Sequence, residues 1–218
     1  MIKFARIPLK DFIKKYNPQE PKKETIENFE KEINSLLENA KGQDGEEFQK
    51  NEINFFLKNT YDYHCNTYEK VDSAIYVDGK AWVLIEVKAL NNRNEFPKDR
   101  ENPLSKAFCQ MVFYFLKEIE NNNSLKHTII CNAHEFFLFD CKDLLFLNDD
   151  RIKKFYKNYA QKEGTDPSTK RFYSDLEEYL KKDFKGELRY THFNLSSYDP
   201  KEELSLIYQV LSHEVLLK

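Results

Sequence analysis

The segment from Val71 to Lys88 most constrains the fold, because apolar and polar residues alternate on both sides of an Asp78-Gly79 pair. Alternation with a period of two predicts β-strands, and Asp-Gly between two such runs predicts a β-hairpin. Strands rich in Val and Ile belong in a core, where charges are costly unless they are paired or bind a metal. Asp72, Glu86 and Lys88 are such charges. They are therefore the first candidates for a functional site.

The length of the hairpin loop decides whether the two acids face each other. A two-residue loop would set Asp72 opposite Ile85. A three-residue loop would pair Val77 with Ala81. It would then set Asp72 opposite Glu86 on one face of the hairpin. Two carboxylates that close repel each other unless a divalent cation relieves the repulsion. We expect the three-residue loop.

Composition limits the class of protein. The 218 residues suffice for one domain, and a hydrophobic share of 40% with a charged share of 33% is typical of a soluble globular chain. We expect a cytoplasmic protein without a membrane span, because no apolar run has the necessary length and no signal peptide is evident. The four cysteines form no CxxC pair, which favours free thiols. A net charge of −3 disfavours a stand-alone DNA binder but leaves room for a catalytic domain with an acidic metal site.

Periodicity along the chain predicts an α/β fold. Two strands, a long helix and two more strands follow one another, which suggests a sheet with a helix crossing one face by a right-handed connection. The expected helices cover residues 8–16, a run from an N-cap at Thr25 to about 40, 46–59, 103–121, 149–163, a run from 166 onward and a last run ending near 213. The expected strands of the second half cover 126–132, 134–140 and 187–195.

Two helices carry further candidates. Glu46 and Glu47 open the third expected helix, where they either complement the helix dipole or reach the hairpin. Gln110 and Tyr114 are four residues apart in the long helix and therefore lie one above the other. The alternative for this pair is a polar rim on a core helix. The polar residues 91–102 form a loop that could close over a substrate, although a solvated loop is the simpler interpretation.

The order of these pieces resembles the PD-(D/E)xK nuclease superfamily. Val71-Asp72 stands where that family has its first motif, with valine in place of proline, and Glu86-Val87-Lys88 stands where it has its ExK. The pair Gln110 and Tyr114 resembles the QxxxY element of the RecB-like branch.

A closer resemblance covers nearly the whole chain. The stretches MIKFARIPLKDFI, EEFQKN, IEVK and LRYTHFNL are similar to the N-terminal nuclease region of type IIG restriction–modification proteins. In those proteins one polypeptide joins an endonuclease to an adenine methyltransferase and a target-recognition domain. By that likeness Glu47 is a better match than Glu46. The likeness implies a restriction-endonuclease-like core, with a mixed sheet flanked by helices, in a single nuclease-like domain spanning 1–218. Within it, N-terminal helices would occupy 1–45, the core 46–147, and a helical extension with one strand 148–218.

The resemblance and the residue types together predict a Mg²⁺-dependent endodeoxyribonuclease domain, in which Mn²⁺ could substitute. The expected metal ligands are Asp72, Glu86, the Val87 carbonyl and Glu47. Lys88 would orient the attacking water, and Gln110 and Tyr114 would position the strand or Lys88.

The expected partners are double-stranded DNA, a methyltransferase and target-recognition domains in the same longer polypeptide or in trans, and a second copy on DNA. No glycine-rich loop in this segment suits S-adenosylmethionine. Two other functions stay open: a non-catalytic module of the same fold that binds DNA or docks a methyltransferase, and a RecB-like repair or recombination nuclease.

Overall fold

The computed structural model describes residues 1–42, 44–68, 71–159 and 166–218. At residues 68, 71, 72 and 166–168 the description covers the backbone and not the side chain.

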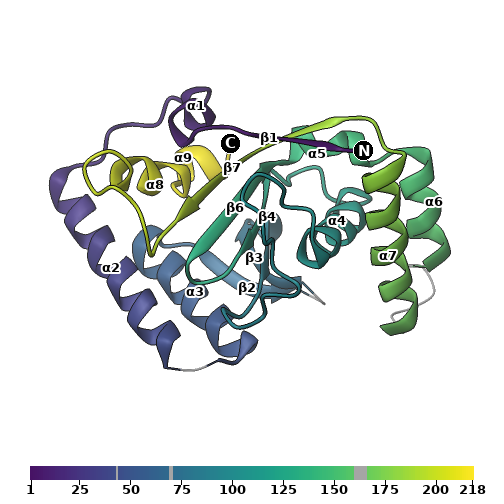
Figure 1. Ribbon diagram of the computed structural model, residues 1–218. Helices are drawn as coiled ribbons and strands as arrows, with labels where there is room; N and C mark the ends of the chain where they lie inside the picture. Colours follow the sequence, from purple (N-terminus) through teal and green to yellow (C-terminus); the bar gives the residue numbers. More distant parts are fainter. Residues whose placement is uncertain (43, 69–70, 160–165) are drawn as a thin grey trace.

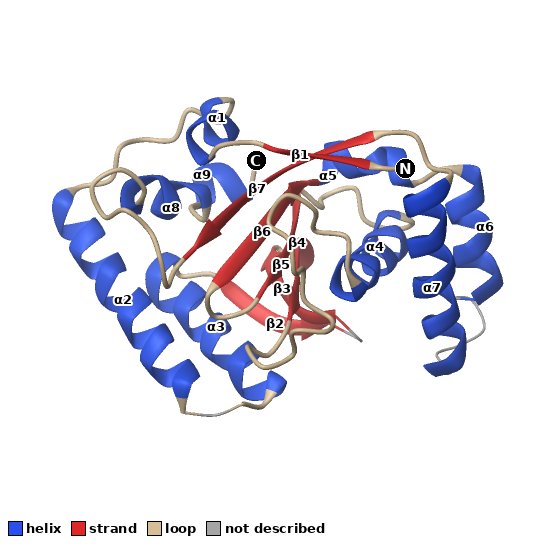
Figure 2. Ribbon diagram, viewed as in Figure 1, coloured by secondary structure: helices blue, strands red, loops and turns tan. Residues whose placement is uncertain are grey.

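A seven-stranded mixed sheet forms the centre of the described chain, in the order β1-β7-β6-β5-β4-β3-β2 (Figures 1 and 2). The pairs β4–β5 and β1–β7 are parallel and the other neighbours are antiparallel. The expected α/β class is confirmed, and so is a helix connecting the parallel pair. The edge strand β1 was not expected. The strands are β1 Lys3–Arg6, β2 His64–Tyr68, β3 Val71–Val77, β4 Lys80–Val87, β5 His127–Cys131, β6 Glu135–Asp140 and β7 Glu187–Asn194.

Helices cover both faces of this sheet (Figure 1). One face carries α1 Leu9–Lys14, α2 Lys23–Lys41, α3 Glu46–Tyr61, α8 Leu204–Val210 and α9 His213–Leu216. The other carries α4 Lys106–Ile119, α6 Asp150–Tyr159 and α7 Asp166–Lys182. The short α5 Cys141–Leu144 and the 3₁₀ helix Leu145–Leu147 follow β6.

The alternation in β4 separates two hydrophobic cores, as its sequence pattern predicts. Leu84 packs in the core under α4, whereas Val83, Ile85 and Val87 pack in the core under α2 and α3. All four side chains are at most 2% exposed. Full burial of such a side chain contributes about 1.5–3 kcal/mol, so β4 is a principal stabilising element of the sheet.

Several helix ends differ from the predictions. Helix α2 begins at Lys23 with Lys22 at its N-cap, so Thr25 does not cap it. The final helical run is divided, because α8 ends at Val210 and the short α9 follows. Helix α6 extends to Tyr159, and the remainder of the predicted range, 160–163, lies outside the described residues.

The expected three-residue hairpin loop is wrong. Val77 pairs with Lys80, which leaves a two-residue loop. Asp78 and Gly79 have φ of 50° and 75°, as the tight two-residue hairpin turn of type I′ requires.

A bulge then changes the register. Tyr76 pairs with Ala81 and Ile75 pairs with Val83, so Trp82 is the extra residue on β4. Beyond the bulge, Ser73 pairs with Ile85. This is the register that a three-residue loop would have produced, and its next step sets residue 72 opposite Glu86.

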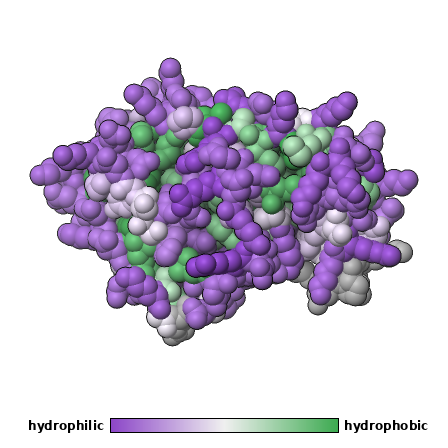
Figure 3. Space-filling view, in the orientation of Figure 1, coloured by the Kyte–Doolittle hydropathy of each residue, from purple (hydrophilic) through white to green (hydrophobic). Residues whose placement is uncertain are grey.

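The surface in Figure 3 is mostly hydrophilic, with smaller apolar patches. Among the described residues the large apolar side chains that are exposed are Met1, Phe55 and Leu145. None of the described helices combines the length and the apolar character that crossing a bilayer would require. All four cysteines are free thiols, which confirms the interpretation of their spacing.

Candidate active site at the end of strand β4

A buried ion pair lies where β4 ends. Lys88 Nζ is 2.8 Å from Glu86 Oε1, and each side chain is only 3% exposed. The Lys88 backbone N–H donates to Cys131 O at 2.9 Å, which ties this end of β4 to β5. Burying two charges is costly unless their geometry is good and their remaining groups are hydrogen-bonded. Burial of the pair therefore costs folding free energy, and buried charges of this kind are found preferentially at functional sites.

Helix α3 adds a second acid, and it is Glu46 that lies near the pair. Glu46 Oε1 is 3.5 Å from Lys88 Nζ. Glu47, the acid favoured by the family likeness, is 75% exposed and pairs with Lys50 on its own helix. Side chains three or four residues apart share a helix face, so Glu46 lies on the face of Gln49 and Ile53, which are fully buried. The geometry favours Glu46 over Glu47.

The segment after β4 forms one wall of the site. Leu90 N–H donates to the buried Gln49 Oε1 at 2.9 Å, which fixes the start of this segment against α3. Glu95 pairs with Lys106 and also lies 3.8 Å from Lys88 Nζ. Partial burial tends to raise the pKa of Glu95, but the hydrogen bond and charge of Lys106, followed by the charge of Lys88, outweigh it and lower the pKa. Glu95 is therefore ionised at neutral pH.

The opposite wall comes from α4 and α7. Tyr173 of α7 is 8% exposed, and its hydroxyl accepts a hydrogen bond from the Gln110 amide. Burial raises the pKa of Tyr173, and the nearby Tyr114 and Glu86 raise it further, so this hydroxyl stays protonated. Gln110 Oε1 is buried and has no hydrogen-bond partner among the described residues. Gln110 is thus hydrogen-bonded to Tyr173, and the charges of Tyr114 and Glu86 act on the same hydroxyl.

The remaining predicted site residues are Asp72 and Val87. Residue 72 lies in β3, one step beyond the Ser73–Ile85 pair, and its side chain lies outside the described part of the chain. Val87 is fully buried and pairs with Cys131 in the sheet.

The described side chains do not by themselves provide enough ligands for a metal ion. They contain no group of three His, Cys, Asp or Glu residues able to hold a metal ion. Glu46 and Glu86 both lie within 4 Å of the Lys88 ammonium, at 3.5 and 2.8 Å. Carboxylates are the hard ligands that Mg²⁺ prefers, and position 72 would supply a third one from the strand facing Glu86. The described side chains thus supply two carboxylates near Lys88 and no complete cation site.

Sequence reasoning missed four contributors: Glu46 as the nearer acid, Gln49, Glu95 and Tyr173. A signal existed for Glu46 and Gln49, because both continue the buried face of Ile53 toward the start of α3. Glu95 belongs to an irregular segment, and Tyr173 is one of several aromatic residues in a helical run. Nothing local in the sequence points to their place beside Lys88 and Gln110.

The comparison with protein families yields one match. A family model described as a domain of unknown function (DUF7149) matches residues 7–218, so the chain belongs to that family. No curated protein matches the chain, and no solved structure matches it.

Proposed function

We propose that this DUF7149 member is a metal-dependent DNA endonuclease domain with a PD-(D/E)xK type of centre. The observation that carries the proposal is the buried Glu86–Lys88 pair at the end of β4, with the Glu46 carboxylate 3.5 Å from the same ammonium. A Glu-x-Lys pair that closes a central strand beside a second acid suits metal-assisted phosphodiester hydrolysis. The carboxylates supply oxygen ligands for a metal ion, and the ammonium can offset the negative charge that develops on the phosphate.

The acids would hold the metal. Glu86, Asp72 and the Val87 carbonyl would supply the ligands of Mg²⁺, and Glu46 would bind it directly or through water. When bound, the cation would lower the pKa of a coordinated water and offset the negative charge of the phosphate.

Lys88 would act on the reacting atoms. Its ammonium pairs most closely with Glu86 in the structure, and it would turn toward the reacting atoms if Glu86 served as a metal ligand instead. Lys88 then donates to the attacking water or to the phosphate oxygens. Tyr173, whose pKa is raised in part by the charge of Glu86, is hydrogen-bonded to Gln110, and the two side chains would restrict the positions that Glu86 can adopt.

The family resemblance suggests the wider setting. The domain would cut double-stranded DNA for a type IIG restriction–modification system, with the methyltransferase and target recognition supplied by other domains. Cutting both strands needs two centres, so two copies would meet on the DNA.

Cleavage of supercoiled plasmid tests the proposal. Purified protein should nick or cut it in Mg²⁺ or Mn²⁺ and not in EDTA. Glu86→Gln and Lys88→Met, purified in the same way, should lose about 10²–10³-fold or more in rate, as loss of a charge-stabilising group does. Equal activity of wild type and Lys88→Met would assign the cleavage to a contaminant and refute the proposal.

Two further comparisons sharpen the test. Comparing the cleavage rates of Glu46→Gln and Glu47→Gln decides between the neighbouring acids of α3. Loss of cleavage only in Glu46→Gln supports the geometry, and loss of cleavage only in Glu47→Gln supports the family likeness. DNA binding without cleavage, retained in Glu86→Gln, would favour the non-catalytic module. Activity on linear DNA that is absent on circles would favour a RecB-like exonuclease.

A further inference from the structure

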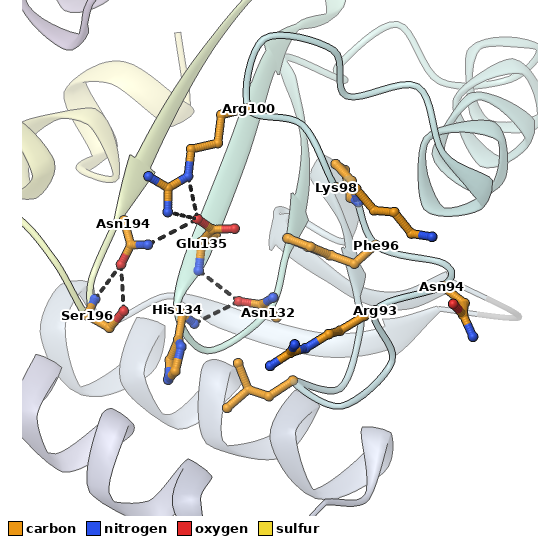
Figure 4. A pocket seen from close by; sticks show the side chains of 12 residues that line it. Arg93, Asn94, Phe96, Lys98, Arg100, Asn132, His134, Glu135, Asn194 and Ser196 are labelled. Atoms are coloured by element: carbon orange, nitrogen blue, oxygen red, sulfur yellow. Dashed lines mark hydrogen bonds and ion pairs between the residues drawn. The ribbon is translucent and has the colours of Figure 1, made fainter.

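A cavity lies at the edge of the sheet where β5 and β7 end (Figure 4). It encloses about 680 Å³, within the range of ligand pockets. Three segments line it: the irregular chain after β4, the β5–β6 turn and the end of β7. We call it the loop pocket. Its lining is Leu90, Arg93, Asn94, Phe96, Pro97, Lys98, Arg100, Asn132, His134, Glu135, Asn194 and Ser196.

The loop pocket begins next to the candidate active site. Val87 pairs with Cys131 in parallel strands, so Asn132 of the pocket follows at the strand end beside Lys88. The irregular segment serves both places. Its Glu95 lies 3.8 Å from Lys88, whereas the flanking Arg93 lines the pocket. The pocket and the candidate active site are therefore neighbours at the ends of β4 and β5.

One wall of the pocket is electrically neutral. Arg100 holds Glu135 through contacts of 2.6 and 2.8 Å, and Asn194 donates to the same carboxylate at 3.1 Å. The interaction with His192, followed by that with Arg100, overcomes the effect of burial and lowers the pKa of Glu135 to about 2. Burial lowers the pKa of His134, so this imidazole is uncharged at neutral pH. Glu135 and Arg100 thus neutralise each other.

The other wall carries unpaired positive charge. Arg93 and Lys98 are exposed, and neither has an acidic partner within ion-pair distance in the described part of the chain. Phe96 and Leu90 provide apolar surface between them and the sheet. In a chain with a net charge of −3, two free cations on one pocket mark a place for an anionic ligand.

We infer that the loop pocket binds the sugar–phosphate backbone of a DNA strand on one side of the phosphate at Lys88, an inference that rests on the proposed function. Arg93 and Lys98 contact phosphates, and the amides of Asn132 and Asn194 border the sugar. Contacts to the backbone position a strand without reading its sequence. The pocket therefore sets the path of the DNA and leaves recognition to other domains.

Binding of a short fluorescein-labelled duplex, followed by fluorescence anisotropy in Ca²⁺, tests the pocket in the full chain. The variant Arg93→Gln/Lys98→Gln should bind about tenfold or more weakly, and the slope of log K against log salt should fall by about 2. The charge-matched control is Lys154→Gln/Lys157→Gln on α6, where both lysines are exposed. It should bind within about twofold of wild type. Arg93→Lys should keep most of the affinity.

The outcomes separate the pocket from the nuclease proposal. The wild-type chain could bind DNA and yet fail to cut it with any divalent cation tested. Loss of affinity in the pocket variant would then uphold the pocket and refute the nuclease. Unchanged affinity in the pocket variant, or an equal loss in the α6 control, refutes the pocket even if Lys88-dependent cleavage is found. Absence of DNA binding by wild type also refutes the pocket. Circular dichroism confirms that each variant is folded.

Discussion

Replacing Lys88 should destabilise the protein more than replacing its closest partner, Glu86. Lys88 faces three carboxylates, at 2.8 Å for Glu86, 3.5 Å for Glu46 and 3.8 Å for Glu95. Lys88→Met leaves these carboxylates without their shared cation. Glu86→Gln leaves Lys88 with two acids and keeps a hydrogen-bonding side chain of the same shape.

The distances give the size of the effect. At an effective dielectric constant of about 20 the three contacts correspond to about 6, 5 and 4 kcal/mol of attraction. Hydration of the partly exposed Glu46 and Glu95, together with the cost of burying Lys88, offsets most of it. Loss of one partner of a buried pair costs about 3–5 kcal/mol, which we expect for Lys88→Met. For Glu86→Gln we expect about 1–2 kcal/mol.

Urea unfolding followed by circular dichroism, at pH 7 in low salt without divalent cations, measures both values. The double variant Glu86→Gln/Lys88→Met should be more stable than Lys88→Met, because it removes one of the carboxylates left facing the others. A cost for Glu86→Gln equal to or above that for Lys88→Met would refute the view that Lys88 holds the cluster together.

Two further predictions concern stability away from the site. Burial lowers the pKa of His127 to about 4. The unfolded chain, with a pKa of about 6.5, binds the proton first, so up to about 3 kcal/mol of stability is lost as the pH falls from about 6.5 to about 4. His127→Gln should flatten this dependence of the urea midpoint, and an unchanged slope would contradict the assignment. A Cβ at Gly186 would lie 2.8 Å from Phe184 and 3.1 Å from Phe146, so Gly186→Ala should cost about 1–3 kcal/mol. Gly45→Ala, where the nearest contact would be 3.9 Å, is the matched control in thermal unfolding, and equal Tm values would show that the two rings can move apart.

In helix α3 the sequence alone predicts which side chains face the candidate site. Ile53 is buried, and steps of four and then three residues back along the helix reach Gln49 and Glu46. Helical phase alone therefore turns Glu46 inward and Glu47 outward. The family likeness favours Glu47, whereas the phase of the apolar residues favours Glu46, because burial of a helix face orients every side chain on it.

The hairpin shows the opposite case. Its two strands and its turn residues were predictable, because alternation and an Asp-Gly pair are local signals. The bulge at Trp82 was not, since it depends on how β4 fits between β3 and β5. Two differences of one residue, in the loop and in the bulge, cancel, so that Ser73 pairs with Ile85 as in the predicted register.

The sequence by itself determined the α/β class, the strand that ends in Glu86 and Lys88, and the helix that carries Gln110 and Tyr114, because these follow from local periodicity. Only the tertiary structure decided what surrounds them. Tyr173 approaches Gln110 because α7 packs on α4, and Glu95 approaches Lys88 because an irregular segment is held at both ends. Such contacts join residues far apart in the chain, and their free energy comes from packing that no local pattern encodes.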